Sequence, residues 1–485
     1  MGPRFGGAAS PVRRAGQGAW CLLAALTLAL ATPGPAAGQD ERGPRLLREP
    51  HSYVDVPDAA DGDDPIDVNV HVGFLQTWTL SRIEREEPSA DGRTSRSFVD
   101  IANARHVQTR LLLGVEVGLF RDLALFANLP LILSDDRRLG RVDGVDPVER
   151  LQADDTLPTD PPDYEPPPLF SVPFDSPTRS GVDHVALGLA WSILNQARRP
   201  WLPTWVVRVE GRFNLGAPLR PCTTESGTTA CRRWAIDEGG DWSFTSTENG
   251  GMSRGVNALR LETRASFRHD YVEPFAGFVF QMEWPGAARR SFTPVPGLEG
   301  YGQRRPPVLG RFTGGLAVIP WEDRSDAQRF AIDLRLEGAF LSEGRDYTPL
   351  FDALGTSDNH YLSNPVAEGD PNIDPDVATV PFIGLTDVGS RGEIGGSLML
   401  ELRAARFVRF QLGGRVAYTT PYLITQAMAC NVGVRGIPNG DARRAGCPRG
   451  IIDPHHRPVL DLPGQRFRVN DQVRFDLAVR ASGLF

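Results

Sequence analysis

The fold is decided by the final stretch of the sequence, Val473-Arg-Phe-Asp-Leu-Ala-Val-Arg-Ala-Ser-Gly-Leu-Phe485. Apolar or small residues occupy every second position from Val473 to Phe485, and Arg474, Asp476 and Arg480 stand between them. Successive side chains of a β-strand point to opposite faces of the sheet. The stretch is therefore predicted to be a strand with one apolar face and one polar face, as in a wall between lipid and water.

The same two-residue alternation recurs along the chain, and no helical periodicity of any length follows the N-terminal region. Each repeat is about as long as a strand needs to be to cross a bilayer at a tilt. Together with the last stretch, this gives about twelve segments: 66–82, 105–119, 123–134, 183–194, 205–215, 256–268, 271–284, 308–319, 329–341, 391–403 and 407–419 precede it.

The connections between these segments alternate strictly between short and long. The short ones are 121–122, 196–203, 269–270, 321–328 and 404–406, and the long ones are 83–104, 135–182, 217–254, 285–306, 343–390 and 421–468. Outer-membrane barrels have short periplasmic turns and long extracellular loops, whereas a soluble sandwich has no reason to sort its connections in this way. We therefore predict that 66–485 is an all-β, transmembrane, antiparallel up-and-down barrel of about twelve strands.

The N-terminal region has the features of an export signal. Arg4, Arg13 and Arg14 precede an apolar run, 20–31, that is too short to span a bilayer as a helix, and small residues and prolines follow it. We predict a cleaved secretory signal peptide at 1–38 and a flexible, acidic periplasmic lead-in at 39–65. The expected location is the cell outer membrane of a Gram-negative bacterium.

The composition limits the possible partners and covalent links. The net charge is −8 and no basic cluster stands out, which argues against nucleic acid as a partner. Four cysteines follow the predicted signal, and an even number in an exported chain indicates disulfides. The pairings with the shortest loops are Cys222 with Cys231 and Cys430 with Cys447.

Two short stretches resemble known outer-membrane proteins. The alternating strand that ends on Phe485 is similar to the C-terminal signature of bacterial outer-membrane barrels. In that class, the signature is taken up by the barrel-assembly machinery. The stretch Glu116-Val-Gly-Leu-Phe-Arg-Asp-Leu-Ala-Leu-Phe-Ala-Asn-Leu-Pro130 resembles a hairpin of outer-membrane transporters, including some linked to phenol-degradation pathways. The resemblance implies contact with outer-membrane lipid and a pore or uptake role, and it assigns no binding residue.

The polar faces of the predicted strands carry many charged residues, which we expect to line the lumen. They can select solutes by charge, or they can pair across strands and fill a modest lumen. The candidates are Arg110, Glu116, Arg208, Glu210, Arg212, Arg260, Glu262, Arg264, Asp333, Arg335, Glu337, Glu401, Arg403, Arg409, Arg415, Arg474 and Asp476. The densest basic stretches, around Arg208–Arg212 and Arg260–Arg268, are where an anion site is expected first.

These features favour a non-enzymatic channel or transporter for an unidentified small solute, with a charged, narrow lumen and no cofactor or metal. A non-conducting structural or adhesive barrel that acts through its extracellular loops is the alternative. The third possibility is a membrane-embedded hydrolase that uses His360, Ser363 and Asn364, which lie close together in 343–390. These three residues lie within a loop, where no strand fixes their geometry.

Overall fold

The computed structural model of this chain describes residues 50–57, 59–61, 64–87, 97–146, 151, 167–225, 227–236, 242–323, 326–363, 380–405, 407–444 and 446–485. All of them belong to one compact unit, Leu46–Phe485. Among these residues, no helix is long and apolar enough to cross a membrane. The predicted signal peptide, 1–38, and the first part of the predicted lead-in, 39–49, lie outside the described residues.

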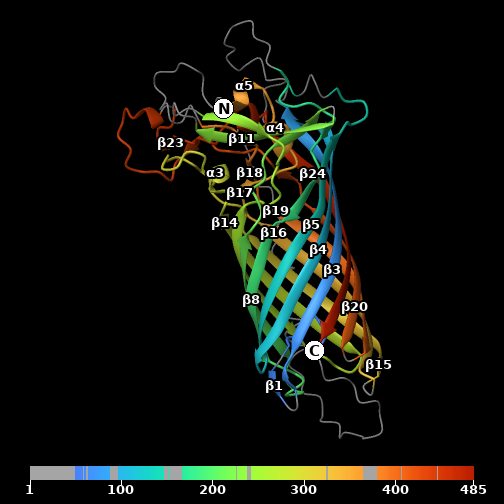
Figure 1. Cartoon of the computed structure of the whole chain (residues 1–485). Helices are drawn as coiled ribbons and strands as arrows, with labels where there is room; N and C mark the ends of the chain where they lie inside the picture. The colour runs from blue at the N-terminus through green and yellow to red at the C-terminus, as the bar shows by residue number, and fades with distance from the viewer. Residues whose placement is uncertain are drawn as a thin grey trace, which may run out of the picture. The chain divides into compact units, whose positions relative to one another are not determined.

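Twelve antiparallel strands form the closed barrel that the sequence predicts (Figure 1). In chain order they are β3 (Val68–Glu87), β4 (Ser97–Phe120), β5 (Leu123–Gly140), β8 (His184–Leu194), β9 (Thr204–Asn214), β13 (Val256–Ser266), β14 (Val272–Pro285), β15 (Leu309–Asp323), β16 (Gln328–Leu341), β19 (Arg391–Ala405), β20 (Val408–Thr419) and β24 (Phe467–Leu484). Each pairs with the next, and β24 pairs with β3 to close the ring. Closure leaves no unpaired sheet edge, as a bilayer requires.

The outer wall of the barrel is apolar. Phe74, Leu189, Val209, Phe278 and Leu398 are among the large side chains that remain exposed on alternate strand positions. In water, an apolar surface that surrounds the whole molecule would drive aggregation, whereas a lipid bilayer covers it at no cost. The barrel therefore has the exterior of a protein that crosses the outer membrane.

The two ends of the barrel differ in their connections. At one end, which we call the turn end, β4 and β5 are joined by only Arg121 and Asp122, and Arg121 has the positive φ (44°) that two-residue hairpin turns favour. Val68 and Phe485 also meet there, and each backbone N–H donates to the carbonyl of the other. At the opposite end, the loop end, lie the long connections.

Several strands extend further toward the loop end than the sequence indicated. The predicted loop 83–104 shrinks to 88–96, because β3 and β4 continue past the expected boundary, and β5 and β24 are longer as well. In these extensions the strands meet protein on both faces, so the alternation of apolar and polar side chains is lost. Glu86, for example, is fully buried and accepts hydrogen bonds from the Arg466 guanidinium at 2.7 and 2.9 Å.

The long connections fold together into a cap at the loop end, which we define as the described parts of 141–183, 215–255, 286–308, 342–390 and 420–466 (Figure 1). Loop residues such as Phe170, Leu354, Phe382 and Leu460 pack with strand-end residues such as Ile101 in one buried cluster. Burying a large apolar side chain stabilises a fold by roughly 1.5–3 kcal/mol. The cluster therefore holds segments that are distant in sequence in one arrangement.

Short elements build the cap and the approach to the first barrel strand. The helices are α3 (Arg289–Phe292), α4 (Phe351–Gly355), α5 (His360–Ser363), α7 (Pro458–Asp461) and the 3-10 turn η1 (Ala442–Arg444). The small strands of the cap are β6 (Phe174–Asp175), β7 (Arg179–Val182), β10 (Cys222–Glu225), β11 (Thr228–Ile236), β12 (Trp242–Thr247), β17 (Gly344–Asp346), β18 (Thr386–Val388), β21 (Tyr422–Leu423), β22 (Cys430–Asn431) and β23 (Ile451–Ile452). The hairpin β1 (Ala59–Asp61) and β2 (Asp64–Ile66) precedes β3.

Both predicted cysteine pairs are bonded, Cys222 to Cys231 and Cys430 to Cys447. Each closes a loop within the cap, with sequence separations of 9 and 17 residues. The disulfides therefore constrain the segments that lack the continuous hydrogen-bond ladder of the barrel.

Candidate functional site

The inner wall of the barrel is a network of arginine and carboxylate side chains. All of the predicted lumen residues occupy strand positions opposite in direction to the exposed apolar residues, on the inner face. The ion pairs among them include Arg208–Glu116, Arg212–Glu210, Arg260–Glu262, Arg264–Glu262, Arg335–Asp333, Arg409–Glu401 and Arg474–Asp476. Arg110 donates to Gln108, and Arg403 is buried near the turn end.

Arg415 shows how these pairs link the strands. Its Nε lies 3.0 Å from Glu337 Oε2, one terminal nitrogen lies 2.5 Å from Glu393 Oε1, and the other lies 3.2 Å from Asp476 Oδ2. The planar guanidinium group can bind several carboxylate oxygens at once in fixed directions. Arg415 on β20 therefore cross-links β16, β19 and β24 across the lumen wall.

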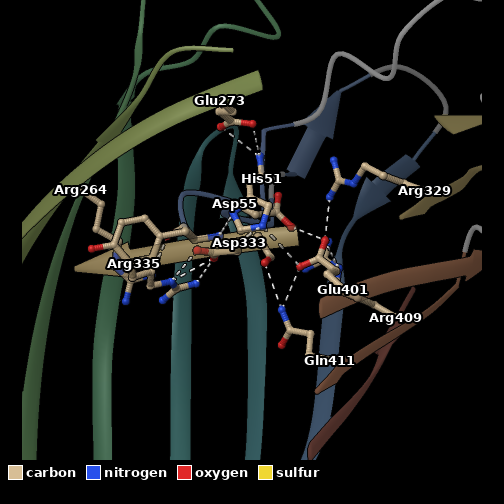
Figure 2. A network of polar contacts seen from close by, with 12 residues as sticks. His51, Asp55, Arg264, Glu273, Arg329, Asp333, Arg335, Glu401, Arg409 and Gln411 are labelled. Carbon is tan, nitrogen blue, oxygen red and sulfur yellow. Dashed lines mark hydrogen bonds and ion pairs between the residues drawn. The ribbon is translucent and has the colours of Figure 1, made fainter. Parts of the chain in front are cut away.

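The main site that the sequence did not predict is an N-terminal segment, residues 50–57, that lies inside the barrel (Figure 2). The backbone N–H of His51 donates to both carboxylate oxygens of Glu273, at 3.2 and 3.1 Å. Asp55 Oδ2 accepts from Arg409 at 2.8 Å, and Ser52 Oγ accepts from Gln411 at 3.0 Å. These partners come from different strands, so the segment crosses the lumen.

Aromatic packing fixes the middle of the segment. The Tyr53 ring lies 4.8 Å from the Phe275 ring between centroids, and the guanidinium groups of Arg264 and Arg335 lie 4.7 and 4.8 Å from the centre of the Tyr53 ring. Such cation–π contacts stabilise by about 0.5–2 kcal/mol each. Val54 is buried against Val206 and other wall residues.

A glycine makes room for Tyr53. A Cβ atom at Gly277 would lie 2.1 Å from the Tyr53 hydroxyl oxygen, a distance that no real contact allows. The hydroxyl therefore occupies the space where any other residue of β14 would place its side chain. The wall is shaped to accept the segment.

His51 sits among buried carboxylates near the turn end. Its Nε2 lies 3.8 Å from Asp333 Oδ2 and 4.0 Å from Glu401 Oε2, and both carboxylates are fully buried. Arg329 balances this charge with a 2.9 Å pair to Glu401 (Figure 2). The contact residues Glu273, Arg329 and Arg409 are each the second residue of their strand after a turn. The segment therefore obstructs the lumen at the turn end.

The described residues enclose two adjoining cavities within the lumen. The lower one, about 240 Å³, is bounded by Ser52 and Asp55 of the N-terminal segment and by wall residues that include Glu116, Arg208 and Arg409. The middle one, about 510 Å³, is lined by residues that include Arg110 and Arg212. The cavities share lining residues such as Arg260 and Arg480, and so lie next to each other.

The sequence predicts charged side chains on the inner strand faces, and it did not predict the N-terminal segment that lies among them. It also missed the polar wall residues His71 and Asn128, because uncharged positions carry a weaker signal than paired charges. The structure places 50–57 inside the barrel, whereas the sequence indicated a flexible periplasmic lead-in. The apolar pair Tyr53 and Val54 within a polar stretch was the available sign of burial.

The cap carries its own buried ion pairs. Arg179 and Asp352 are both 3% exposed, and their closest nitrogen–oxygen distance is 2.6 Å. Arg345 pairs with Asp387 at 2.9 Å, again with both side chains buried. Removing one partner of such a pair leaves an uncompensated buried charge, which destabilises strongly. The cap is therefore a folded structure and not a set of independent loops.

Two carboxylic acids of the cap have raised pKa values. Burial raises the pKa of Asp461 to about 8, and burial together with the nearby Asp387 raises the pKa of Asp453 to about 7. In the unfolded chain, both acids lose their protons near pH 3.8. Between these limits the folded cap binds more protons than the unfolded chain, so its stability falls as pH rises.

We expect the cap to open more readily as the pH is raised from about 5 to about 8. The rate at which added protease cleaves the cap, divided by the rate for a denatured substrate at the same pH, should rise over this window. Asp461→Asn should flatten the rise. Asp441→Asn is the matched control, because Asp441 is a cap acid whose pKa is lowered to about 2 by its hydrogen bonds with Arg443. Equal slopes in the two variants would contradict the assignment to Asp461.

The residues considered for a hydrolase lie in and beside α5. His360 and Ser363 are the first and last residues of this helix, and Asn364 lies outside the described residues. Within the part of the chain that the structure describes, no group of three or more His, Cys, Asp or Glu residues is placed to hold a metal ion.

No protein-family model and no curated protein matches this chain. Among solved structures, it is similar to an outer-membrane channel from Pseudomonas putida F1, with 9% identity, a TM-score of 0.34, and coverage of 88% of this chain and 100% of that one. It is also similar to a Pseudomonas aeruginosa FadL homologue (6% identity, TM-score 0.30, coverage 87% and 90%). The P. putida toluene transporter TodX is a further similar structure (11% identity, TM-score 0.24, coverage 88% and 91%). These similarities assign no solute and no residue role to this chain.

Proposed function

We propose that this protein is an outer-membrane channel for small solutes that pass through a narrow, charged lumen. The observation that supports this proposal is the inner wall, where arginine and carboxylate groups surround two adjoining cavities of about 240 and 510 Å³. A purely structural barrel could fill its interior with apolar side chains, whereas this one keeps polar space inside an apolar exterior. Fixed charges around such space select solutes by sign and by hydrogen bonding.

The lumen is restricted at both ends. The N-terminal segment lies across the turn end, and the cap covers the loop end. These features favour small solutes and a low basal conductance over a wide, open pore. In this proposal the predicted signal peptide exports the chain, and the barrel-assembly machinery takes up the strand that ends on Phe485.

Reconstitution into planar bilayers tests the channel. We expect small but discrete current steps in potassium chloride, because the residual polar space permits ions to pass only slowly. Heat-modifiable migration on a gel should establish that the inserted protein is a folded barrel. Folded protein that leaves bilayers silent, even after the N-terminal segment is removed, would favour the non-conducting barrel that acts through its cap.

A further inference from the structure

We propose that the middle of the lumen is a binding chamber for an amphipathic organic monocarboxylate, that is, a small acid with an apolar body. The chamber is the cavity of about 510 Å³. As a statement about the transported solute, the inference rests on the proposed channel function. As a statement about binding, it can be tested without any conductance.

The chamber occupies a full cross-section of the barrel. Its lining comes from β3, β4, β5, β8, β9, β13, β19, β20 and β24, so it is bounded by most of the wall and not by one hairpin. It adjoins the lower cavity that the N-terminal segment closes. A solute in the chamber therefore lies on the only axis along which the barrel can conduct.

Positive charge is in excess in this chamber. Four guanidinium groups, those of Arg110, Arg212, Arg260 and Arg480, line it together with one carboxylate, that of Glu210. Glu210 is already engaged, because its Oε1 accepts from Arg212 Nε at 2.6 Å. The positive charges of Arg110, Arg260 and Arg480 are therefore not balanced by a carboxylate that lines the chamber.

The partners of those three arginines lie elsewhere or are not acids. Arg260 shares Glu262 with Arg264, at 3.2 and 2.8 Å, and its buried Nε has no hydrogen-bond partner. Arg110 donates to the Gln108 amide oxygen. Among the residues that the structure describes, Arg480 has no carboxylate within ion-pair distance. A guanidinium group without a carboxylate partner, such as that of Arg480, attracts an anion inside a lumen where little solvent screens its charge.

Besides the charged groups, the chamber wall has uncharged polar residues, His71, Asn128, His184 and Gln411, and an apolar part. Leu75, Leu112, Pro130, Ala186, Met399 and Ala478 line it on inward strand positions. Leu75 stands directly opposite Arg110 in the β3–β4 register and opposite Ala478 in the β24–β3 register. A ligand that meets both kinds of wall has an anionic head and an apolar body.

Other ligand classes fit less well. A cation would meet the excess of guanidinium groups, and a neutral hydrocarbon would leave them unpaired. Inorganic phosphate would satisfy the arginines but would leave the apolar wall without contacts. A carboxylate accepts the two parallel hydrogen bonds that a guanidinium fork offers, and a phenyl ring or short alkyl chain covers the apolar side.

Equilibrium dialysis of the full-length, detergent-solubilised protein against radiolabelled benzoate tests the chamber at neutral pH. Unlabelled hexanoate should compete, whereas benzyl alcohol and inorganic phosphate should compete at least about tenfold more weakly, because each lacks one of the two recognised features. Equal competition by benzyl alcohol would show that charge plays no part. Equal competition by phosphate would show that the apolar wall plays none, and either result overturns the proposal.

Substitutions that should weaken benzoate binding, and one that should strengthen it, make the test stricter. Arg480→Gln and Arg110→Gln should each weaken benzoate binding roughly tenfold, the loss expected for one hydrogen bond to a charged group. Glu210→Gln should strengthen binding, because it removes the negative charge of Glu210 from the chamber and keeps an oxygen acceptor for Arg212. Arg138→Gln is the control: Arg138 is an exposed arginine of β5 that lies 3.5 Å from Asp175 and does not line the chamber, and benzoate binding should not change.

The outcomes separate this inference from the proposed function. Protein that conducts in bilayers but does not bind benzoate leaves the channel standing and overturns the chamber. Arginine-dependent binding by protein that never conducts supports the chamber and removes the channel. If Arg480→Gln fails to fold, Glu210→Gln still decides the matter, because weaker or unchanged binding in that variant contradicts the charge argument.

Discussion

Deletion of residues 50–57 is expected to raise the single-channel conductance several-fold. The segment lies across the lumen, and its contacts with Glu273, Arg409 and Gln411 would be lost together with the volume of Tyr53. The barrel itself should survive, because its backbone hydrogen bonds run between strands that the deletion leaves intact. Conductance steps of wild-type and deleted protein in the same bilayer and salt give the measurement.

A point substitution tests the same idea without shortening the chain. Gly277→Ala would place a methyl group where the Tyr53 hydroxyl now lies, so the N-terminal segment should be displaced and the conductance should rise toward that of the deletion. Gly338→Ala is the control, since a Cβ atom there meets no atom within 4 Å. If the deletion and Gly277→Ala both conduct like the wild type, the segment does not limit the current.

Asp352→Ala is expected to destabilise the cap by about 3–5 kcal/mol, the usual cost of leaving a buried charge unpaired. Asp352 accepts two hydrogen bonds from Arg179, at 2.6 and 3.0 Å, and a third from the backbone N–H of Cys222 at 3.0 Å. It thereby joins α4, β7 and β10, which come from three different long connections. Hydrogen exchange should accelerate in all three, while the barrel strands should remain protected.

An exposed pair between β5 of the barrel and β6 of the cap provides the control for this substitution. Arg138 and Asp175 lie 3.5 Å apart with their side chains 66% and 61% exposed, so Asp175→Ala should cost less than about 1 kcal/mol. The double variant Arg179→Met with Asp352→Leu should recover part of the lost stability, because no charge then remains buried. Equal exchange in Asp352→Ala and Asp175→Ala would mean that the buried pair does not hold the cap.

The barrel was predictable because its signal is local. Alternation in a strand such as 205–215 requires only the period of two that lipid on one side and a polar lumen on the other impose. The boundaries were predicted less well at the loop end, where strand residues such as Glu84 and Glu86 meet protein on both faces and the alternation disappears.

The cap and the N-terminal segment could not be predicted in the same way, because their contacts join residues that are far apart in sequence. Arg179 meets Asp352 across 173 positions, and Asp55 meets Arg409 across 354. No periodic pattern encodes such pairs, since each depends on where the folded strands place their ends. The alternation predicts which charged residues share a strand face, whereas the pairing among them and the lack of an ion-pair partner for Arg480 among the described residues required the folded structure.

The pairing of β24 with β3 closes the barrel, so the barrel can close only after β24 has been made. This pairing joins residues near the two ends of the chain, with Phe485 paired to Val68 and Ala481 paired to Val72. A nascent chain that stops before β24 can complete every earlier hairpin, yet it leaves the edges of β3 and β20 open. In a bilayer, those open edges carry unpaired backbone groups at a cost of several kcal/mol each. Truncated copies therefore retain two exposed strand edges that the closed barrel does not have.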